Sequence, residues 1–139
     1  MTQRRYRRAV LNLLLLAVLC VPAGTGAADL DGWRQGFEAG VKAREAAHYR
    51  QAESLLTQAL QEAEHTGGDE APVALAANQL GLLYHDQGRL TEAESLYRRA
   101  LGLWESQLGP EHEDVAAALN NLAEIAHARG DWAAAEPLY

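Results

Sequence analysis

The feature that most constrains the fold is an internal repeat with a period of 41 to 42 residues. Residues 80–97 and 122–139 align without gaps at a shift of 42, and Leu, His, Gly, Ala, Glu, Leu and Tyr recur at seven matched positions. A third copy lies upstream at a shift of 41, where residues 52–60 match residues 93–101. Periods of this length are typical of folds that stack one small helical or mixed unit several times. The chain is therefore expected to form a repeat array.

The first half of each copy is expected to be a helix. Over residues 71–87 the apolar residues follow the three- and four-residue spacing of one helical stripe. Pro72 suits the first turn of a helix, where its missing N–H is not needed. Gly88 suits the end, because glycine enters the left-handed conformation without strain. The stripe consists of Val73, Ala76, Ala77, Leu80, Leu83 and Tyr84.

The second half of each copy is expected to be another helix. The pattern resumes over residues 91–106, where Thr91 and Glu94 have the spacing of a capping box. Asp114 is expected to cap the next helix, which should run to Arg129. Because an isolated helix pair cannot bury its own apolar stripe, neighbouring pairs are expected to stack.

Small residues recur where the helices should cross. In the first helix of each copy one position holds Gly40, Gly81 and Ala123. In the second helix one position holds Ala52, Ala93 and Ala135. The large residues of the second helix are Leu56, Tyr97 and Tyr139. Helices approach to about 8–10 Å where the side chains at the contact are small. The pattern therefore predicts that the large side chains pack onto the small positions of the paired helix.

At these residues the chain resembles the tetratricopeptide repeat (TPR) family, and more closely its 42-residue kinesin-light-chain-like branch. The resemblance is carried by Leu-Gly-Leu-Leu-Tyr at 80–84, Ala-Glu at 93–94, Leu-Tyr at 96–97, Leu-Gly-Pro-Glu-His at 108–112 and Leu-Asn-Asn-Leu-Ala at 119–123. It covers residues 32–139 and implies an all-α fold, a right-handed superhelical stack of antiparallel helix pairs with about 2.5 repeats.

The three copies are not equivalent. Repeat 1 spans about residues 32–68, repeat 2 about 71–110 and repeat 3 about 113–139, within a TPR domain of residues 29–139. In repeat 1, Ala47 and His48 stand where the other copies have glycine, and Trp33 and Phe37 supply bulk. Repeat 3 ends about seven residues into its second helix. We interpret the chain as a fragment of a longer array, or as a small protein that completes its core with a partner or a second copy of itself.

The N-terminal segment has the pattern of a secretory signal peptide. A basic stub, Met1–Arg8, precedes an apolar run, Ala9–Pro22, and small residues up to Ala28. Cleavage after residue 27 or 28 would export the protein to the periplasm or beyond the cell and leave no membrane span. An uncleaved anchor is the alternative. Lipidation of Cys20 is a weaker one, because Leu19 is larger than the residue that this processing prefers.

The composition excludes several kinds of function. Residues 29–139 carry 8 basic and 19 acidic residues, a formal charge of −11, so nucleic-acid binding is not expected. No nucleophile elbow and no phosphate-binding glycine loop is present, so neither an enzyme nor a cofactor is predicted. His85 and His127 lie 42 residues apart, but they lack the additional ligands that a zinc site requires, so no metal is predicted.

The expected binding site is the concave groove that the first helices of a superhelical stack would line. Three rows of matched residues should face it. They are Phe37, Asn78 and Asn120; Val41, Leu82 and Glu124; and Arg44, His85 and His127. An asparagine side chain both donates and accepts hydrogen bonds, so a row of them can hold a peptide main chain. The resemblance implies the same use, because family members grip peptide backbones with asparagines at these positions.

The function predicted from the sequence is therefore an exported, non-enzymatic scaffold that binds a protein or peptide segment in its groove. Arg44, His85 and His127 are expected to give this acidic protein a local positive edge. Binding of an acidic ligand should then strengthen as the histidines protonate between about pH 7 and 6. Two alternatives stay open: the interaction module of a longer protein whose catalytic or effector domain is missing, and a structural unit that self-associates through its open C-terminal helix.

Overall fold

The computed structural model describes residues 28–67 and 69–138, and this part of the chain is helical with no strand. Its elements are α2 (Ala28–Glu45), α3 (Tyr49–Thr66), α4 (Ala71–Asp86), α5 (Leu90–Leu108), α6 (Glu113–Ala128), α7 (Trp132–Ala135) and the 3₁₀ helix η1 (Glu136–Leu138). The all-α prediction is confirmed. The predicted signal peptide lies outside the described residues apart from Ala28, at which α2 begins.

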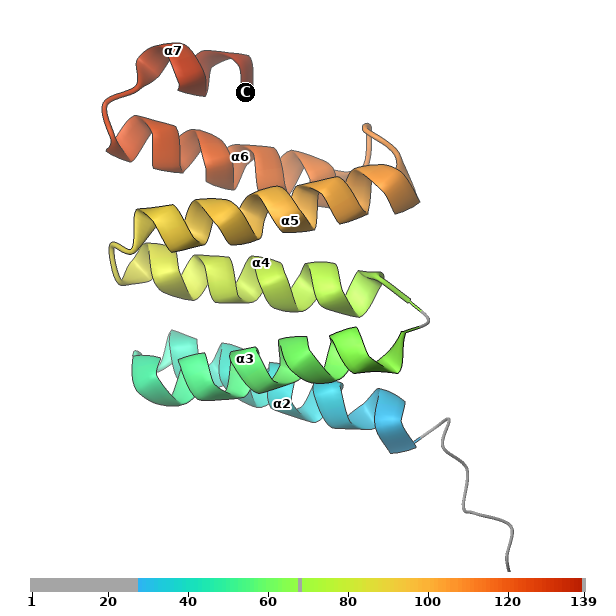
Figure 1. The fold of residues 1–139 in the computed structure, drawn as a ribbon. Coiled ribbons are helices and arrows are strands. Elements are labelled where there is room, and N and C mark those ends of the chain that lie inside the picture. The colour runs from blue at the N-terminus through green and yellow to red at the C-terminus, as the bar shows by residue number, and fades with distance from the viewer. Residues whose placement is uncertain (1–27, 68, 139) are drawn as a thin grey trace, which may run out of the picture.

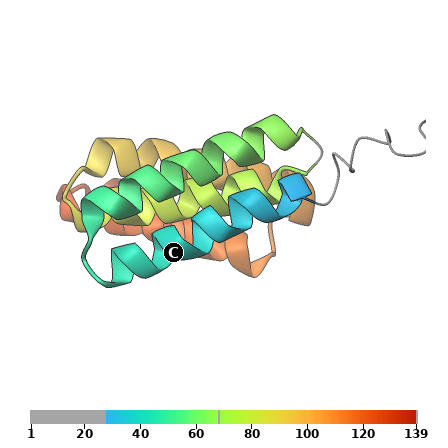
Figure 2. The ribbon, with the colours of Figure 1, turned by 90° about the horizontal axis from the view of Figure 1, so that it is seen from below.

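The helices form antiparallel pairs that stack on one another. Figure 1 shows the pairs α2–α3, α4–α5 and α6–α7 following each other along the stack. Seen along the stack in Figure 2, α3 and α5 lie on one side and α2 and α6 on the other. The first helices of repeats 1 and 2, α2 and α4, also touch each other directly. The predicted stack of helix pairs is therefore confirmed.

The glycine positions pack as predicted. A Cβ atom at Gly40 would lie 2.7 Å from Cγ of Leu56, and one at Gly81 would lie 2.8 Å from Cε1 of Tyr97. Leu56 is 0% exposed and Tyr97 is 1% exposed, so each large side chain fills the notch of its paired helix completely. The third predicted contact, at Tyr139, lies outside the described residues.

The predicted capping box at the start of α5 is wrong. The helix begins one residue earlier, at Leu90, and its N-cap residue makes no side-chain cap. The Thr91 hydroxyl instead accepts a hydrogen bond from Arg129 (3.4 Å), and Glu94 accepts from both Arg98 and Arg129. Charge-assisted bonds from arginine are stronger than a bond to a backbone N–H. They hold the pKa of the Glu94 carboxyl below its usual range, the bond from Arg129 having the largest effect.

The start of α6 also differs from the prediction. His112 is the N-cap residue, and its Nδ1 atom accepts a hydrogen bond from the backbone N–H of Asp114 at 3.2 Å. Asp114 therefore lies in the first turn, where its charge favours the positive end of the helix dipole. The second helix of repeat 3 is shorter than expected, with four α-helical residues in α7 before the chain tightens into η1.

Candidate peptide-binding groove

The nine residues predicted to line the groove come from the three first helices. Phe37, Val41 and Arg44 lie on α2, Asn78, Leu82 and His85 on α4, and Asn120, Glu124 and His127 on α6. None of them is buried. The half-exposed members are Phe37, Val41, Arg44, Asn78, Leu82 and His85, and the fully exposed ones are Asn120, Glu124 and His127. All nine side chains therefore reach a surface, as a binding row requires.

Two side-chain bonds link the first helices on this face. Nη1 of Arg44 on α2 donates to Oδ2 of Asp86 on α4 at 2.9 Å. Nδ2 of Asn121 on α6 donates to Oδ1 of Asn78 on α4 at 3.1 Å. The three helices are thus tied to one another at two levels, and residues 41 to 43 apart in the sequence become neighbours. The sequence did not reveal either bond, because neither pair recurs in the other repeats.

The predicted positive edge is wrong. Arg44 is neutralised by its ion pair with Asp86, and the exposed Glu124 adds a negative charge to the same rows. His127 packs edge-on against Trp132, with the ring centroids 4.3 Å apart. Two histidines without a free arginine beside them do not form a basic site. The predicted strengthening of acidic-ligand binding below pH 7 therefore loses its structural basis.

The predicted asparagine row is only partly free to bind a peptide. The carbonyl oxygen of Asn78 is used by Asn121, whereas no bond from the NH₂ group of Asn78 is found among the described residues. The NH₂ group of Asn120 donates to Glu124 on the same helix at 3.1 Å, which leaves its carbonyl oxygen as an acceptor. One donor group and one acceptor therefore remain on neighbouring helices, which is the pair that an extended main chain requires.

An apolar cleft of about 440 Å³ lies at the N-terminal ends of α2 and α4, and sequence reasoning missed it. Its apolar lining includes Trp33, Pro72 and Leu75, and Arg34 and Asp69 supply its charges. Leu75 is 38% exposed, an unusual state for a leucine beside a buried tryptophan. The Trp33 ring contacts Phe37 at 5.8 Å between centroids, so the cleft adjoins the first row of the predicted groove.

The repeat itself contained a signal for this cleft. Arg34 and Leu75 lie 41 residues apart, each three residues before a predicted groove residue, Phe37 and Asn78 respectively. Residues three apart in a helix share a face. Extending the rows by one turn toward the N-terminal end would therefore have included both.

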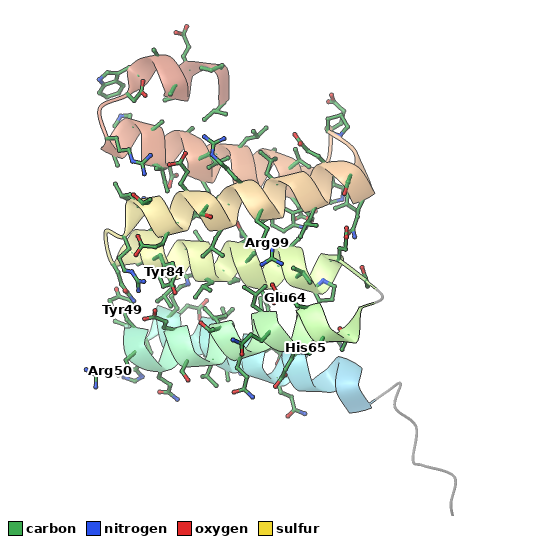
Figure 3. The ribbon with its side chains drawn as sticks, viewed as in Figure 1. Tyr49, Arg50, Glu64, His65, Tyr84 and Arg99 are labelled. Atoms are coloured by element: carbon green, nitrogen blue, oxygen red, sulfur yellow. The ribbon has the colours of Figure 1, made fainter. Side chains whose placement is uncertain are left out.

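A second cleft, of about 700 Å³, lies between α3 and α5. Arg99 and Glu64 form an ion pair across it at 2.6 Å, and Figure 3 shows the two side chains facing each other. Gln107 donates to Glu70 at 3.3 Å along the same cleft. None of the nine predicted groove residues lines either cleft. The described residues also contain no group of three or more His, Cys, Asp or Glu side chains that could hold a metal ion.

Comparison with known proteins agrees with this geometry. The sequence profile of the tetratricopeptide repeat family matches residues 72–139. The chain is a tetratricopeptide repeat protein. The predicted family is thus confirmed, and this TPR chain is a protein-interaction repeat module.

Among solved structures, the TPR chain is similar to BtubC (BKLC) from P. vanneervenii, with a TM-score of 0.64 and 23% sequence identity. The match covers 81% of this chain and 52% of BtubC, so this chain spans about half the length of that protein. At this identity the likeness shows the fold alone. No curated protein sequence matches the chain. No helix in residues 28–67 and 69–138 is both long and apolar enough to cross a membrane.

Proposed function

We propose that this TPR module binds an extended segment of a partner protein across α2, α4 and α6. The observation that carries the proposal is the continuity between the apolar cleft at Trp33 and Leu75 and the row that begins at Phe37. Binding sites for extended segments combine a few apolar recesses with polar groups that fix the main chain. This surface offers both within reach of one ligand.

Each part of the surface has a distinct role. The NH₂ group of Asn78 and the carbonyl oxygen of Asn120 bind the main chain of the segment. Phe37, Val41 and Leu82 are half-buried and contribute apolar contact. The cleft accepts one apolar side chain of the ligand against Leu75 and Trp33. The protein acts by holding its partner, breaks no bond and needs no cofactor.

The groove can be tested with peptides selected from a displayed library of random ten-residue segments. Leu75→Arg places a charged side chain in the mouth of the cleft and should weaken the selected peptides by about tenfold or more. Gln58→Ala is a matched control, because Gln58 is exposed on α3 and bonds only to Glu62 on its own helix. Isothermal titration measures both affinities. An unchanged affinity in Leu75→Arg would place the binding surface elsewhere, and a loss in Arg99→Ala would point to the opposite cleft.

We also propose that the protein is exported. The support is the sequence of residues 1–28, in which a basic stub, an apolar run and small residues follow one another. Edman sequencing and mass measurement of the protein from its own cells should give an N-terminus at Ala28 or Asp29. An N-terminus at Met1 in the mature protein would contradict cleavage and favour an uncleaved anchor.

A further inference from the structure

The hydroxyl group of Tyr97 is not explained by packing. The side chain is 1% exposed, and its hydroxyl oxygen is buried without a hydrogen-bond partner among the described residues. A buried polar group without a partner costs free energy, whereas phenylalanine would fill the same space without this cost. An unpartnered, buried hydroxyl in a native core is therefore a candidate for a functional role.

Charged groups from all three first helices lie around this hydroxyl. The Tyr97 ring crosses α4 at Gly81, where a Cβ atom would come within 2.8 Å of it. Burial has the largest effect on the pKa of the hydroxyl and raises it, and the carboxylates of Asp86 on α4 and Glu124 on α6 raise it further. Arg44 on α2 lowers it. The hydroxyl thus comes from the second helix α5 and senses the charges of the groove.

The charges around the hydroxyl do not balance. Arg44 is held by Asp86 at 2.9 Å, which leaves the carboxylate of Glu124. Within the described part of the chain Glu124 accepts a hydrogen bond only from Asn120 on its own helix and has no cationic partner. Its side chain is exposed and can therefore move. The neighbouring groove residues His85 and His127 carry no fixed positive charge.

We infer that the Tyr97 hydroxyl and the carboxylates of Asp86 and Glu124 form a subsite for one arginine or lysine side chain of the bound segment. This inference rests on the proposed peptide-binding groove. A cationic side chain only donates hydrogen bonds, and two carboxylates and a phenolic oxygen can all accept them. Because the hydroxyl oxygen is covered in this structure, the cation reaches it after a side-chain shift, for which Glu124 is the free member. The charge of −11 on residues 29–139 draws cationic partners in general.

The test uses three peptides that differ at one position. From the displayed library we take the tightest ten-residue peptide and place Arg, Gln or Glu at each position in turn. At one position the Arg peptide should bind at least about tenfold more tightly than the Gln peptide, with the Glu peptide weakest, as expected for a charge-assisted pair. In Tyr97→Phe and Glu124→Gln this preference should shrink to about twofold or less, while the affinity of the Gln peptide stays the same.

The outcomes separate the subsite from the groove. Asn78→Ala should weaken all three peptides equally, because it removes main-chain contact alone. If peptides bind but Arg has no advantage at any position, or if Tyr97→Phe retains the full advantage, the subsite is wrong and the groove stands. A preference for Glu would also overturn it. If no library peptide binds, the groove and the subsite fail together. Thermal melts of both variants must show a folded protein, and Tyr97→Phe is expected to melt no lower than the natural chain.

Discussion

Repeats 1 and 2 form the same helical hairpin from sequences that agree where the helices cross and differ where they turn. Both crossings use glycine, at Gly40 and Gly81. The turn of repeat 2 contains Gly88 with φ of 73°, whereas repeat 1 has Ala47 there, held at φ of 59°. An L-residue other than glycine is strained in this left-handed region. The comparison shows that helix packing imposes the turn, since the chain forms it even where the residue resists it.

The two repeats also differ on the face that meets the preceding helices. In repeat 2, the Tyr84 hydroxyl donates to Glu53 of repeat 1 at 3.0 Å, and Arg89 bonds to the same carboxylate at 3.0 Å. The Arg89 guanidinium also lies 3.9 Å from the centroid of the Tyr84 ring. Repeat 1 has Ala43 at the position of Tyr84 and cannot form such a network. Repeat 2 is therefore bound to its neighbour by polar contacts in addition to apolar burial.

The largest expected effect is at the crossing that both repeats share. Gly81→Leu would drive a branched side chain into the Tyr97 ring, which has no space to retreat because it is fully buried. We expect a loss of about 3 kcal/mol in the free energy of unfolding, at the upper end for overpacking. Chemical denaturation followed by circular dichroism measures it. An unchanged midpoint would contradict the position of Gly81 at the helix crossing.

Gly102→Ala is the matched control for this prediction. Gly102 lies inside α5, and a Cβ atom there would meet nothing within 4 Å. Replacing a helical glycine by alanine at such a position should raise the free energy of unfolding by about 0.5–1 kcal/mol. Opposite signs at two glycines of one repeat would show that the close contact, and not glycine as such, decides the effect.

The crossing was predictable from the sequence because it recurs, and the same reasoning explains what was missed. A feature that the fold requires in every unit, such as the small residue at Gly81, appears as an echo at a fixed step. The ion pair of Arg44 with Asp86 occurs once and leaves no echo, so Arg44 was wrongly taken as a free positive charge. The capping box at Thr91 failed for a related reason, because its glutamate is occupied by an arginine from the next repeat. Contacts between repeats depend on distances that one sequence does not contain.

The polar network of repeat 2 gives the next largest effect. Tyr84→Phe keeps the ring under Arg89 but removes the hydrogen bond to Glu53, and should lower the free energy of unfolding by about 1 kcal/mol. Tyr49→Phe serves as the control, since Tyr49 is 37% exposed and no hydrogen bond of its hydroxyl is found among the described residues. Equal midpoints for the two variants in urea would show that the network contributes nothing.

The turn of repeat 1 gives a smaller effect of opposite sign. Ala47→Gly relieves the strain of the left-handed conformation, and part of the gain is lost to the greater freedom of glycine in the unfolded chain. We expect a net stabilisation of about 0.5–1 kcal/mol, and a loss of similar size for Gly88→Ala in repeat 2. Paired denaturation curves measure both. If Ala47→Gly destabilised the protein, the two turns would not share one geometry.

The smallest effect on stability is expected at Tyr97, and it contrasts with Tyr84. The Tyr84 hydroxyl has a charged acceptor, whereas the Tyr97 hydroxyl is buried without a partner among the described residues. Tyr97→Phe should therefore change the free energy of unfolding by no more than about 0.5 kcal/mol, or raise it, because it removes a desolvated group and keeps the ring. A loss of 1 kcal/mol or more, as at Tyr84, would mean that the hydroxyl has a stabilising partner inside the protein. A tyrosine that costs stability at a core position where phenylalanine would fit is most simply retained for what its hydroxyl contacts in the groove.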